Sequence, residues 1–151
     1  MICGSMRSHI IDLILSFLLL GVISYRLQTK PTLQDDIPLQ NENQEFFLPD
    51  DLSIIHFWAP WSKPSLRQLQ LFHRFTKTHP DIQLIAVHSH LENLASVTSL
   101  KQEKGWPFSL AQTTEFPERL PYTILITKDQ KIVFDKAIYY EQLLEIFERD
   151  H

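Results

Sequence analysis

The chain has 151 residues, of which 44% are hydrophobic and 21% charged, and this length and composition predict one globular domain. The formal net charge is −4 and there is no run of basic residues, which argues against nucleic acid or an acidic lipid surface as a partner. Because Cys3 is the single cysteine, the rest of the chain can contain neither a disulfide framework nor a thiolate metal site.

The first hydrophobic segment has the character of a membrane-directed sequence. After a short tail, residues 1–9, the chain is almost wholly apolar over residues 10–25. Its uninterrupted core, Leu13 to Ile23, has the length of a signal peptide, but no pair of small residues typical of a cleavage site follows. We therefore predict an uncleaved transmembrane anchor rather than a cleaved signal, followed by a polar linker over residues 26–45.

The remainder, residues 46–151, alternates between patterns typical of strands and of helices. Apolar runs bounded by turn signals predict strands over residues 54–58, 82–87, 120–126 and 131–134, with a short edge strand near residue 46 and an irregular segment or short strand at 106–110. Amphipathic patterns predict helices after Pro64, over residues 91–104 and over residues 139–149. The first two long strands, separated by a helix, predict a parallel βαβ unit, and the last two predict an antiparallel hairpin.

The junction between the first strand and the first helix contains a specific motif. It reads Phe57-Trp58-Ala59-Pro60-Trp61 and then Ser62-Lys63-Pro64-Ser65. This junction resembles the thioredoxin superfamily, whose motif at this place is Trp-Cys-x-x-Cys. Here both cysteine positions are serine, Ser62 and Ser65. Thiol–disulfide exchange requires a thiolate, which a serine hydroxyl cannot supply, so the departure predicts a redox-inactive protein.

Three further matches extend the resemblance. Leu120-Pro121-Tyr122-Thr123 resembles the superfamily's x-Pro-Thr loop, whose proline is cis and faces the active site. Residues 104–108 and the hairpin over 124–133 are similar to segments of TlpA-type membrane-anchored thiol:disulfide proteins, most closely the suppressor-of-copper-sensitivity D type. The resemblance implies a thioredoxin-like α/β fold with a central mixed sheet of four to five strands flanked by helices.

The resemblance also implies a binding groove between the two loops. Its expected residues are Trp61, Lys63, Pro64, Leu120, Pro121 and Tyr122. Trp61 and Tyr122 are expected to form an apolar floor for an extended peptide. We expect Ser62 and Ser65 to cap the helix rather than to act as nucleophiles, because nothing in the motif supplies a general base.

Three histidines are candidates for a special role. His56 falls where the superfamily keeps a buried acid beneath the second cysteine, and it could remain neutral and hydrogen-bonded in the interior. His88 and His90 follow the second strand, and their spacing allows a copper or zinc site as well as an ordinary solvated loop.

These observations predict an inner-membrane, single-pass protein whose domain faces the periplasm and binds a protein or extended peptide without a cofactor. Three alternatives stay open at this point. The chain could be a TlpA-type thiol:disulfide reductase whose cysteines were mutated or lost, or a copper or zinc carrier built on His56, His88 and His90. It could also be a degenerate relative with no retained function.

Overall fold

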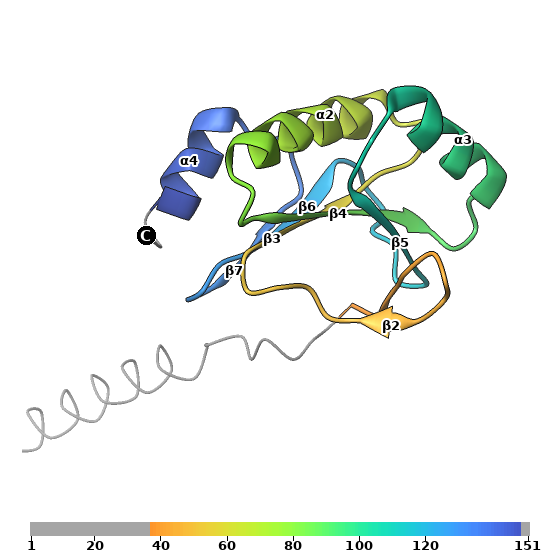
Figure 1. Cartoon of the computed structure of the whole chain (residues 1–151), viewed down its shortest axis with the longest axis horizontal. Helices are drawn as coiled ribbons and strands as arrows, with labels where there is room; N and C mark the ends of the chain where they lie inside the picture. The colour runs from red at the N-terminus through yellow and green to blue at the C-terminus, as the bar shows by residue number, and fades with distance from the viewer. Residues whose placement is uncertain (1–36, 149–151) are drawn as a thin grey trace, which may run out of the picture. The chain divides into compact units, whose positions relative to one another are not determined.

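The computed structural model describes residues 37–148, which form a seven-stranded mixed sheet and three helices (Figure 1). The predicted transmembrane segment, residues 10–25, and the N-terminal tail lie outside these residues. Within residues 37–148, none of the helices combines the length and the apolar character that crossing a bilayer requires.

The sheet has the strand order β2-β1-β5-β4-β3-β6-β7. Its strands are β1 (Leu39–Gln40), β2 (Phe46–Phe47), β3 (Ser53–Phe57), β4 (Gln83–Ser89), β5 (Ser109–Thr113), β6 (Tyr122–Ile126) and β7 (Lys131–Phe134). The central strands β3, β4 and β5 are parallel, β6 runs antiparallel to β3, and β7 pairs antiparallel with β6 as a hairpin. Both the parallel βαβ unit and the C-terminal hairpin predicted from the sequence are confirmed.

The predicted number of four to five strands is wrong, because β1 and β2 extend one edge of the sheet. They pair with each other, and β1 joins β5 through the single pair Gln40 and Gln112. Leu39 is buried, but one apolar residue among polar neighbours produces no alternating pattern. For this reason the sequence pattern predicted a polar linker where Leu39–Gln40 form a strand.

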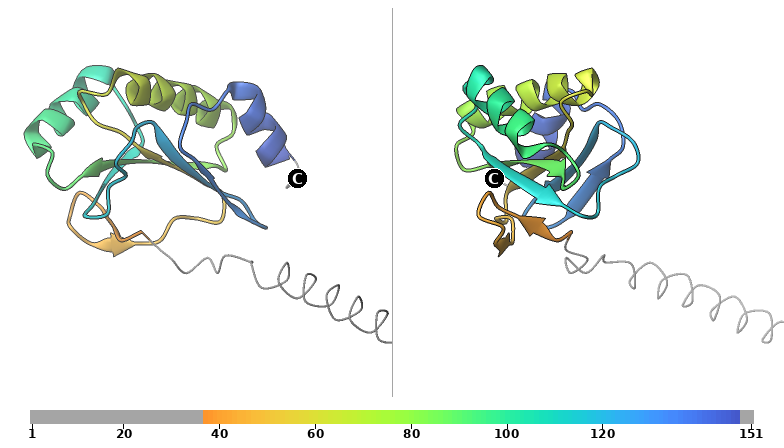
Figure 2. Two further views of the ribbon diagram at one scale, coloured as in Figure 1. Left: turned by 180° about the vertical axis from the view of Figure 1, so that it is seen from behind. Right: turned by 90° about the vertical axis from the view of Figure 1, so that its right-hand side faces the viewer.

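All three helices, α2 (Lys63–Thr78), α3 (Leu94–Lys104) and α4 (Tyr140–Glu148), cover the same face of the sheet (Figures 1 and 2). The predicted apolar face of α2 is confirmed, since Leu69, Phe72 and Phe75 are fully buried in the larger core cluster. Helix α3 ends as expected at Gly105, whose φ of +62° is the left-handed conformation that glycine adopts without steric cost.

The opposite face of the sheet is covered by irregular chain and by the β1–β2 hairpin, which lies beneath the sheet in Figure 1. A second core cluster on this side includes Ile55, Phe57 and Val87, packed with Phe47 and Phe116. Because both faces are buried, the central strands are continuously apolar instead of alternating. The connection from β5 to β6 contains no helix and crosses the carboxyl end of the parallel strands.

One buried polar side chain of α2 bonds to the segment just before α4. Gln68 of α2 donates from Nε2 to the Ile138 carbonyl at 2.9 Å and accepts at Oε1 from the Ile138 N–H at 2.8 Å. This pairing satisfies both backbone groups of Ile138 in the interior, two residues before α4 begins.

Candidate functional site

The candidate site lies at the carboxyl end of β3, where the chain turns into α2. The Trp58 N–H donates to the Val87 carbonyl at 2.9 Å, so the turn is attached to the neighbouring strand β4. Trp58 and Ala59 are fully buried, and the Trp58 ring meets Trp106 edge to face with centroids 5.5 Å apart. Trp58 and Trp106 are thus core residues, and of the aromatic residues in the turn only Trp61 reaches the surface.

The predicted cap of helix α2 is confirmed for Ser62, whereas Ser65 bonds within the turn that precedes the helix. Ser62 is the N-cap, with extended backbone angles, and its hydroxyl accepts from the Ser65 N–H at 3.4 Å. The buried Ser65 hydroxyl donates to the Ser62 carbonyl at 2.9 Å and accepts from the Ala59 N–H at 3.4 Å. Pro64 stands in the first turn, where its missing N–H leaves no bond unmade.

His56 lies directly beneath the second serine. Its Nε2 is 2.9 Å from the Ser65 carbonyl oxygen and its Nδ1 is 2.9 Å from the Thr123 hydroxyl on β6. A carbonyl only accepts, so Nε2 carries the proton and the neutral ring receives the Thr123 hydroxyl at Nδ1. The prediction of a neutral, hydrogen-bonded interior histidine is confirmed.

Burial sets the protonation of this ring. Desolvation lowers the pKa of His56 from its ordinary 6.5 to about 4, and the backbone carbonyls of Ser65 and Tyr122 offset only part of that shift. At neutral pH the ring is therefore uncharged. It faces the Ser65 backbone oxygen and not the Ser65 hydroxyl, so it does not act as a general base on that serine.

The second loop of the site precedes β6. The Leu120–Pro121 peptide bond is cis, as the resemblance implied. Tyr122 is paired with Phe57 in the sheet register, which brings Pro121 to the same end of the sheet as the Ser62 loop. The Tyr122 ring packs edge to face on Phe57 at 5.4 Å, and Leu120 is half-buried beside it.

Trp61 contacts a different neighbour. Its side chain is 72% exposed, and its indole N–H donates to the Glu92 carboxylate at 2.9 Å in the loop that follows β4. Lys63 and Pro64 are exposed next to it. The six predicted groove residues therefore lie at the same end of the sheet, where β3 ends. Trp61 lies toward β4, and Pro121 lies toward β6.

The two remaining histidines do not join a metal-ligand set. His88 is buried with Nδ1 2.9 Å from the Ser89 carbonyl, whereas His90 is exposed with Nδ1 3.3 Å from the Thr113 carbonyl. Within the described part of the chain, no three histidine, cysteine or acidic side chains are grouped so that they could hold a metal ion. The copper or zinc alternative thus has no supporting arrangement there.

Sequence reasoning missed two residues that position the site. Thr123 completes the hydrogen bonding of His56, and Glu92 holds the Trp61 indole. Thr123 lies two residues after Pro121, one position beyond the threonine of the x-Pro-Thr pattern, and it is paired with His56 in the sheet register; its place in the Leu120-Pro121-Tyr122-Thr123 loop was the available signal. No sequence signal indicated Glu92.

The solved structures that superpose on the described residues include thiol:disulfide oxidoreductases. StoA from Bacillus subtilis superposes with a TM-score of 0.57 and 19% sequence identity, over 71% of this chain and 92% of StoA. A thiol:disulfide interchange protein of the thioredoxin family from Chlorobium tepidum matches with a TM-score of 0.59 and 12% identity, over 74% and 90% of the two chains. A secreted Mycobacterium tuberculosis disulfide oxidoreductase homologous to DsbE gives 0.56 and 12%, over 69% and 88%.

These likenesses show that the described residues have the thioredoxin-like α/β fold. No sequence profile of a known family matches the chain, and no curated protein sequence does. At 12 to 19% identity the superpositions establish the fold, and neither the TlpA-type subgroup nor an activity.

Proposed function

We propose that this protein is a redox-inactive, thioredoxin-like binding module that holds an extended segment of a partner protein. The proposed contact surface, which we call the loop surface, consists of Trp61, Lys63, Pro64, Leu120, Pro121 and Tyr122. The observation that carries the proposal is that the Ser62 loop and the Pro121 loop are both present, although the motif between strand and helix lacks thiols. Ser62 and Ser65 stand where the resemblance places cysteines, whereas Pro121 is cis and Trp61 is exposed.

The bonding of the serines supports the absence of covalent chemistry. The Ser62 hydroxyl caps α2 and the Ser65 hydroxyl donates to the Ser62 carbonyl, while the nearest imidazole bonds to a backbone carbonyl with its protonated nitrogen. A serine nucleophile would require an adjacent base, and His56 contacts the Ser65 carbonyl instead of either hydroxyl. Thiol–disulfide exchange would require a thiolate, and the single thiol of the chain belongs to Cys3, outside the described residues.

The exposed indole supports a binding role. The exposure of 72% of the Trp61 side chain to water is unfavourable, because most of its surface is apolar. Burial of this side chain against a partner would contribute strongly to affinity. The bond from its N–H to Glu92 fixes the ring direction before a partner arrives, which reduces the entropy lost on binding.

Binding of an unfolded chain should protect Trp61 from a fluorescence quencher. Of the three tryptophans in the chain, Trp58 and Trp106 are 0% and 6% exposed, so acrylamide quenching of the native protein reports mainly on Trp61. We expect reduced, carbamidomethylated ribonuclease A, a permanently extended probe without tryptophan, to lower the quenching constant about two-fold or more, since a buried indole is shielded from the quencher.

The matched controls are Trp61→Ala and Ser62→Ala. The first should abolish binding of the probe in a pull-down, and the second should leave it nearly unchanged, because capping at Ser62 is not part of the contact. Equal binding by native protein and Trp61→Ala would show that the loop surface is not used.

We further propose that residues 10–25 anchor the chain in the inner membrane with the domain in the periplasm. The apolar core from Leu13 to Ile23 and the lack of a cleavage pattern after it support an anchor. The full chain should stay with the membrane pellet through carbonate extraction. Release into the supernatant, together with a mature N-terminus between Ser24 and Pro31, would instead make it a secreted protein.

A further inference from the structure

Two rows of like charge lie on neighbouring helices. The charged side chains at the exposed positions of α2 are all cations, and those of α4 are all carboxylates. The cationic row is Lys63, Arg67, Arg74 and Lys77, and the acidic row is Glu141, Glu145 and Glu148. We propose that these rows form the interface of a two-fold symmetric dimer, in which each cationic row binds the acidic row of the second copy. The proposal does not depend on the function proposed above.

Each row lies on the side of its helix that faces away from the core. Successive members are three, four or seven positions apart, which keeps them on one helical face, whereas Leu69 and Phe75 of α2 and Leu143 and Phe147 of α4 are buried. The two helices cover the same face of the sheet (Figures 1 and 2). They also contact each other, since the Phe75 and Phe147 ring centroids are 5.9 Å apart.

The cations of α2 are not neutralised within the described part of the chain. Helix α2 contains no acidic residue, and the structure gives the side chains of the cationic row no ion-pair or hydrogen-bond partner within residues 37–148. His73 on the same helix responds to this charge. Partial desolvation and then repulsion from Lys77 lower the pKa of His73, and no carboxylate offsets them.

Neither row stabilises the helix that carries it. Lys63 is the first residue of α2 and Glu148 is the last residue of α4, and each charge is unfavourable with the helix dipole at that end. Neighbouring members of each row, three or four positions apart, also repel each other. A surface of opposite charge would relieve both effects, and a second copy of the chain provides such a surface for both rows.

A two-fold axis brings the rows of two copies together. Rotation about an axis that lies along the surface, midway between α2 and α4, places α2 of one copy over α4 of the other. The same rotation places α4 of the first copy over α2 of the second. Arg67 and Arg74 have the same separation as Glu141 and Glu148, about 10 Å along a helix axis, so these residues can pair. Because both contacts form in one dimer, the assembly is closed and does not grow further.

An exposed aromatic residue lies between the two helices in the chain. Tyr139 is 68% exposed and directly precedes α4. It follows Ile138, whose backbone N–H and carbonyl both bond to Gln68 of α2. Tyrosine is enriched in protein interfaces, because its ring buries apolar area while its hydroxyl keeps a polar contact. Exposed ion pairs alone contribute little, so we assign Tyr139 to the interface as its apolar contact.

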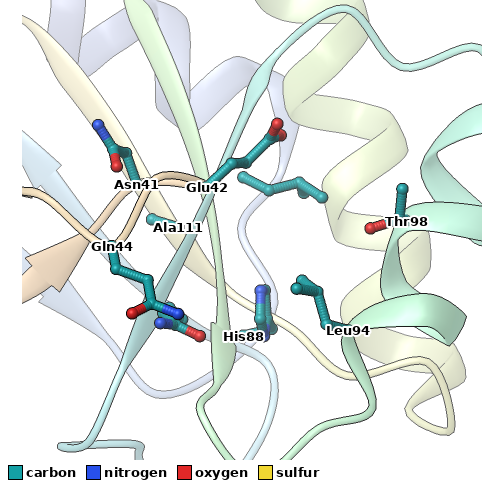
Figure 3. A pocket seen from close by; sticks show the side chains of 9 residues that line it. Asn41, Glu42, Gln44, His88, Leu94, Thr98 and Ala111 are labelled. Atoms are coloured by element: carbon teal, nitrogen blue, oxygen red, sulfur yellow. The ribbon is translucent and has the colours of Figure 1, made fainter.

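A second copy fits the two rows better than a broad anionic surface does. The chain has a net charge of −4, and the acidic row lies on the helix next to the cationic row, so a membrane or a nucleic acid duplex would meet both rows. Neither row belongs to the small pocket between the β1–β2 hairpin and α3, which His88 and Leu94 help to line (Figure 3). The interface therefore does not include the lining of that pocket.

A zero-length carbodiimide cross-linker tests the contact directly, because it joins a lysine amine only to a carboxylate that touches it. The full chain is used in non-ionic detergent, as a mixture of unlabelled and isotope-labelled protein, so that mass spectrometry distinguishes cross-links between two copies from those within one. We expect Lys63 or Lys77 of one copy to be joined to a glutamate of the acidic row of the other. Cross-links that join the rows only within one copy, or no cross-links between them, would overturn the proposal.

Salt should weaken the dimer. An increase from about 0.1 M to about 1 M salt shortens the screening length from about 10 Å to about 3 Å, so the yield of cross-links between copies should fall about ten-fold or more. An unchanged yield would show that the charges do not hold the copies together.

Exchange of the charges distinguishes this pairing from other modes of association. Arg67→Glu with Arg74→Glu places carboxylates opposite carboxylates in a dimer, and Glu141→Lys with Glu148→Lys places cations opposite cations. Each double variant alone should have a dissociation constant about ten-fold or more above the native one, measured by sedimentation in density-matched detergent. A mixture of the two variants restores opposite charges at both contacts and should form a one-to-one dimer. Native dimerisation by either variant alone, or no dimer in the mixture of folded variants, would overturn the proposal.

Two further variants separate the rows from net charge. Glu115→Lys with Glu118→Lys changes the net charge as much as the α4 variant does, at exposed positions between β5 and β6, and should leave the dissociation constant within about two-fold of native. Tyr139→Ala should raise it about ten-fold or more without lowering the urea midpoint. Equal loss of dimerisation in the Glu115 and Glu118 variant, or native dimerisation by Tyr139→Ala, would contradict the proposed interface.

Discussion

Between pH 7 and pH 4.5 the free energy of unfolding should fall by about 2.5 kcal/mol through His56 alone. In the unfolded chain the ring takes up a proton near pH 6.5, whereas burial in the folded protein holds its pKa at about 4. Above pH 6.5 both states are neutral and the full stability is present. As the pH falls from 6.5 toward 4, only the unfolded state gains a proton, so stability declines by about 1.4 kcal/mol per pH unit.

Urea unfolding of the native protein and of His56→Gln isolates this contribution. A glutamine can donate to the Ser65 carbonyl and accept from Thr123 but does not titrate. The difference in stability between the two proteins should therefore shrink by about 2.5 kcal/mol over that pH range. His90→Gln, in which an exposed ring is replaced, should keep the native slope. Parallel pH curves for native protein and His56→Gln would show that the ring is not buried in its neutral form.

Cysteines introduced at both motif positions should give the protein reductase activity. The native chain should not reduce insulin disulfides with dithiothreitol above the buffer rate, because it has no thiol at the motif. Ser62→Cys with Ser65→Cys should give measurable turnover. The capped end of α2 has no acidic residue in its first turn, so its N-terminal dipole is available to stabilise a thiolate. We expect one thiol pKa between about 3.5 and 7.5.

Two controls test separately whether the second thiol is needed and whether the residue at position 56 acts as the proton acceptor. Ser62→Cys alone should form a mixed disulfide with glutathione and show no turnover, because no second thiol resolves it. Adding His56→Asp to the double variant should raise the rate, since the burial that lowers the pKa of His56 to about 4 would raise the pKa of a carboxyl there and make it the better proton acceptor at neutral pH. A folded double variant with two thiol pKa values of about 8.5 would show that the end of α2 does not favour the thiolate.

The parts of the site that were predictable are those coded by consecutive residues. The strand, the cap at Ser62, the proline of the first turn and the apolar face of α2 fall within residues 53 to 75, and each has a local signal. The same holds for the Gly105 helix end and the C-terminal hairpin. In these segments local propensity and the final packing agree, so reasoning from the pattern succeeds.

What was missed depends on residues far apart in the chain. His56 and Thr123 are separated by 67 positions, and Trp61 and Glu92 by 31. Whether a buried histidine finds a hydroxyl, or an exposed indole a carboxylate, is decided by the sheet register and loop placement, which periodicity does not encode. The two-residue strand β1 is also too short to show a period and was missed, whereas the short edge strand expected near residue 46 is present as β2.

The bonds between Gln68 and Ile138 have a consequence for how the protein is made. The two residues are 70 positions apart, and until Ile138 has left the ribosome the Gln68 amide has no partner for its place in the core. During synthesis α2 can form early, but its buried face cannot be completed until residue 138 has been translated. A translation product that stops before Ile138 should therefore remain open to proteases, even though it contains every residue of the loop surface.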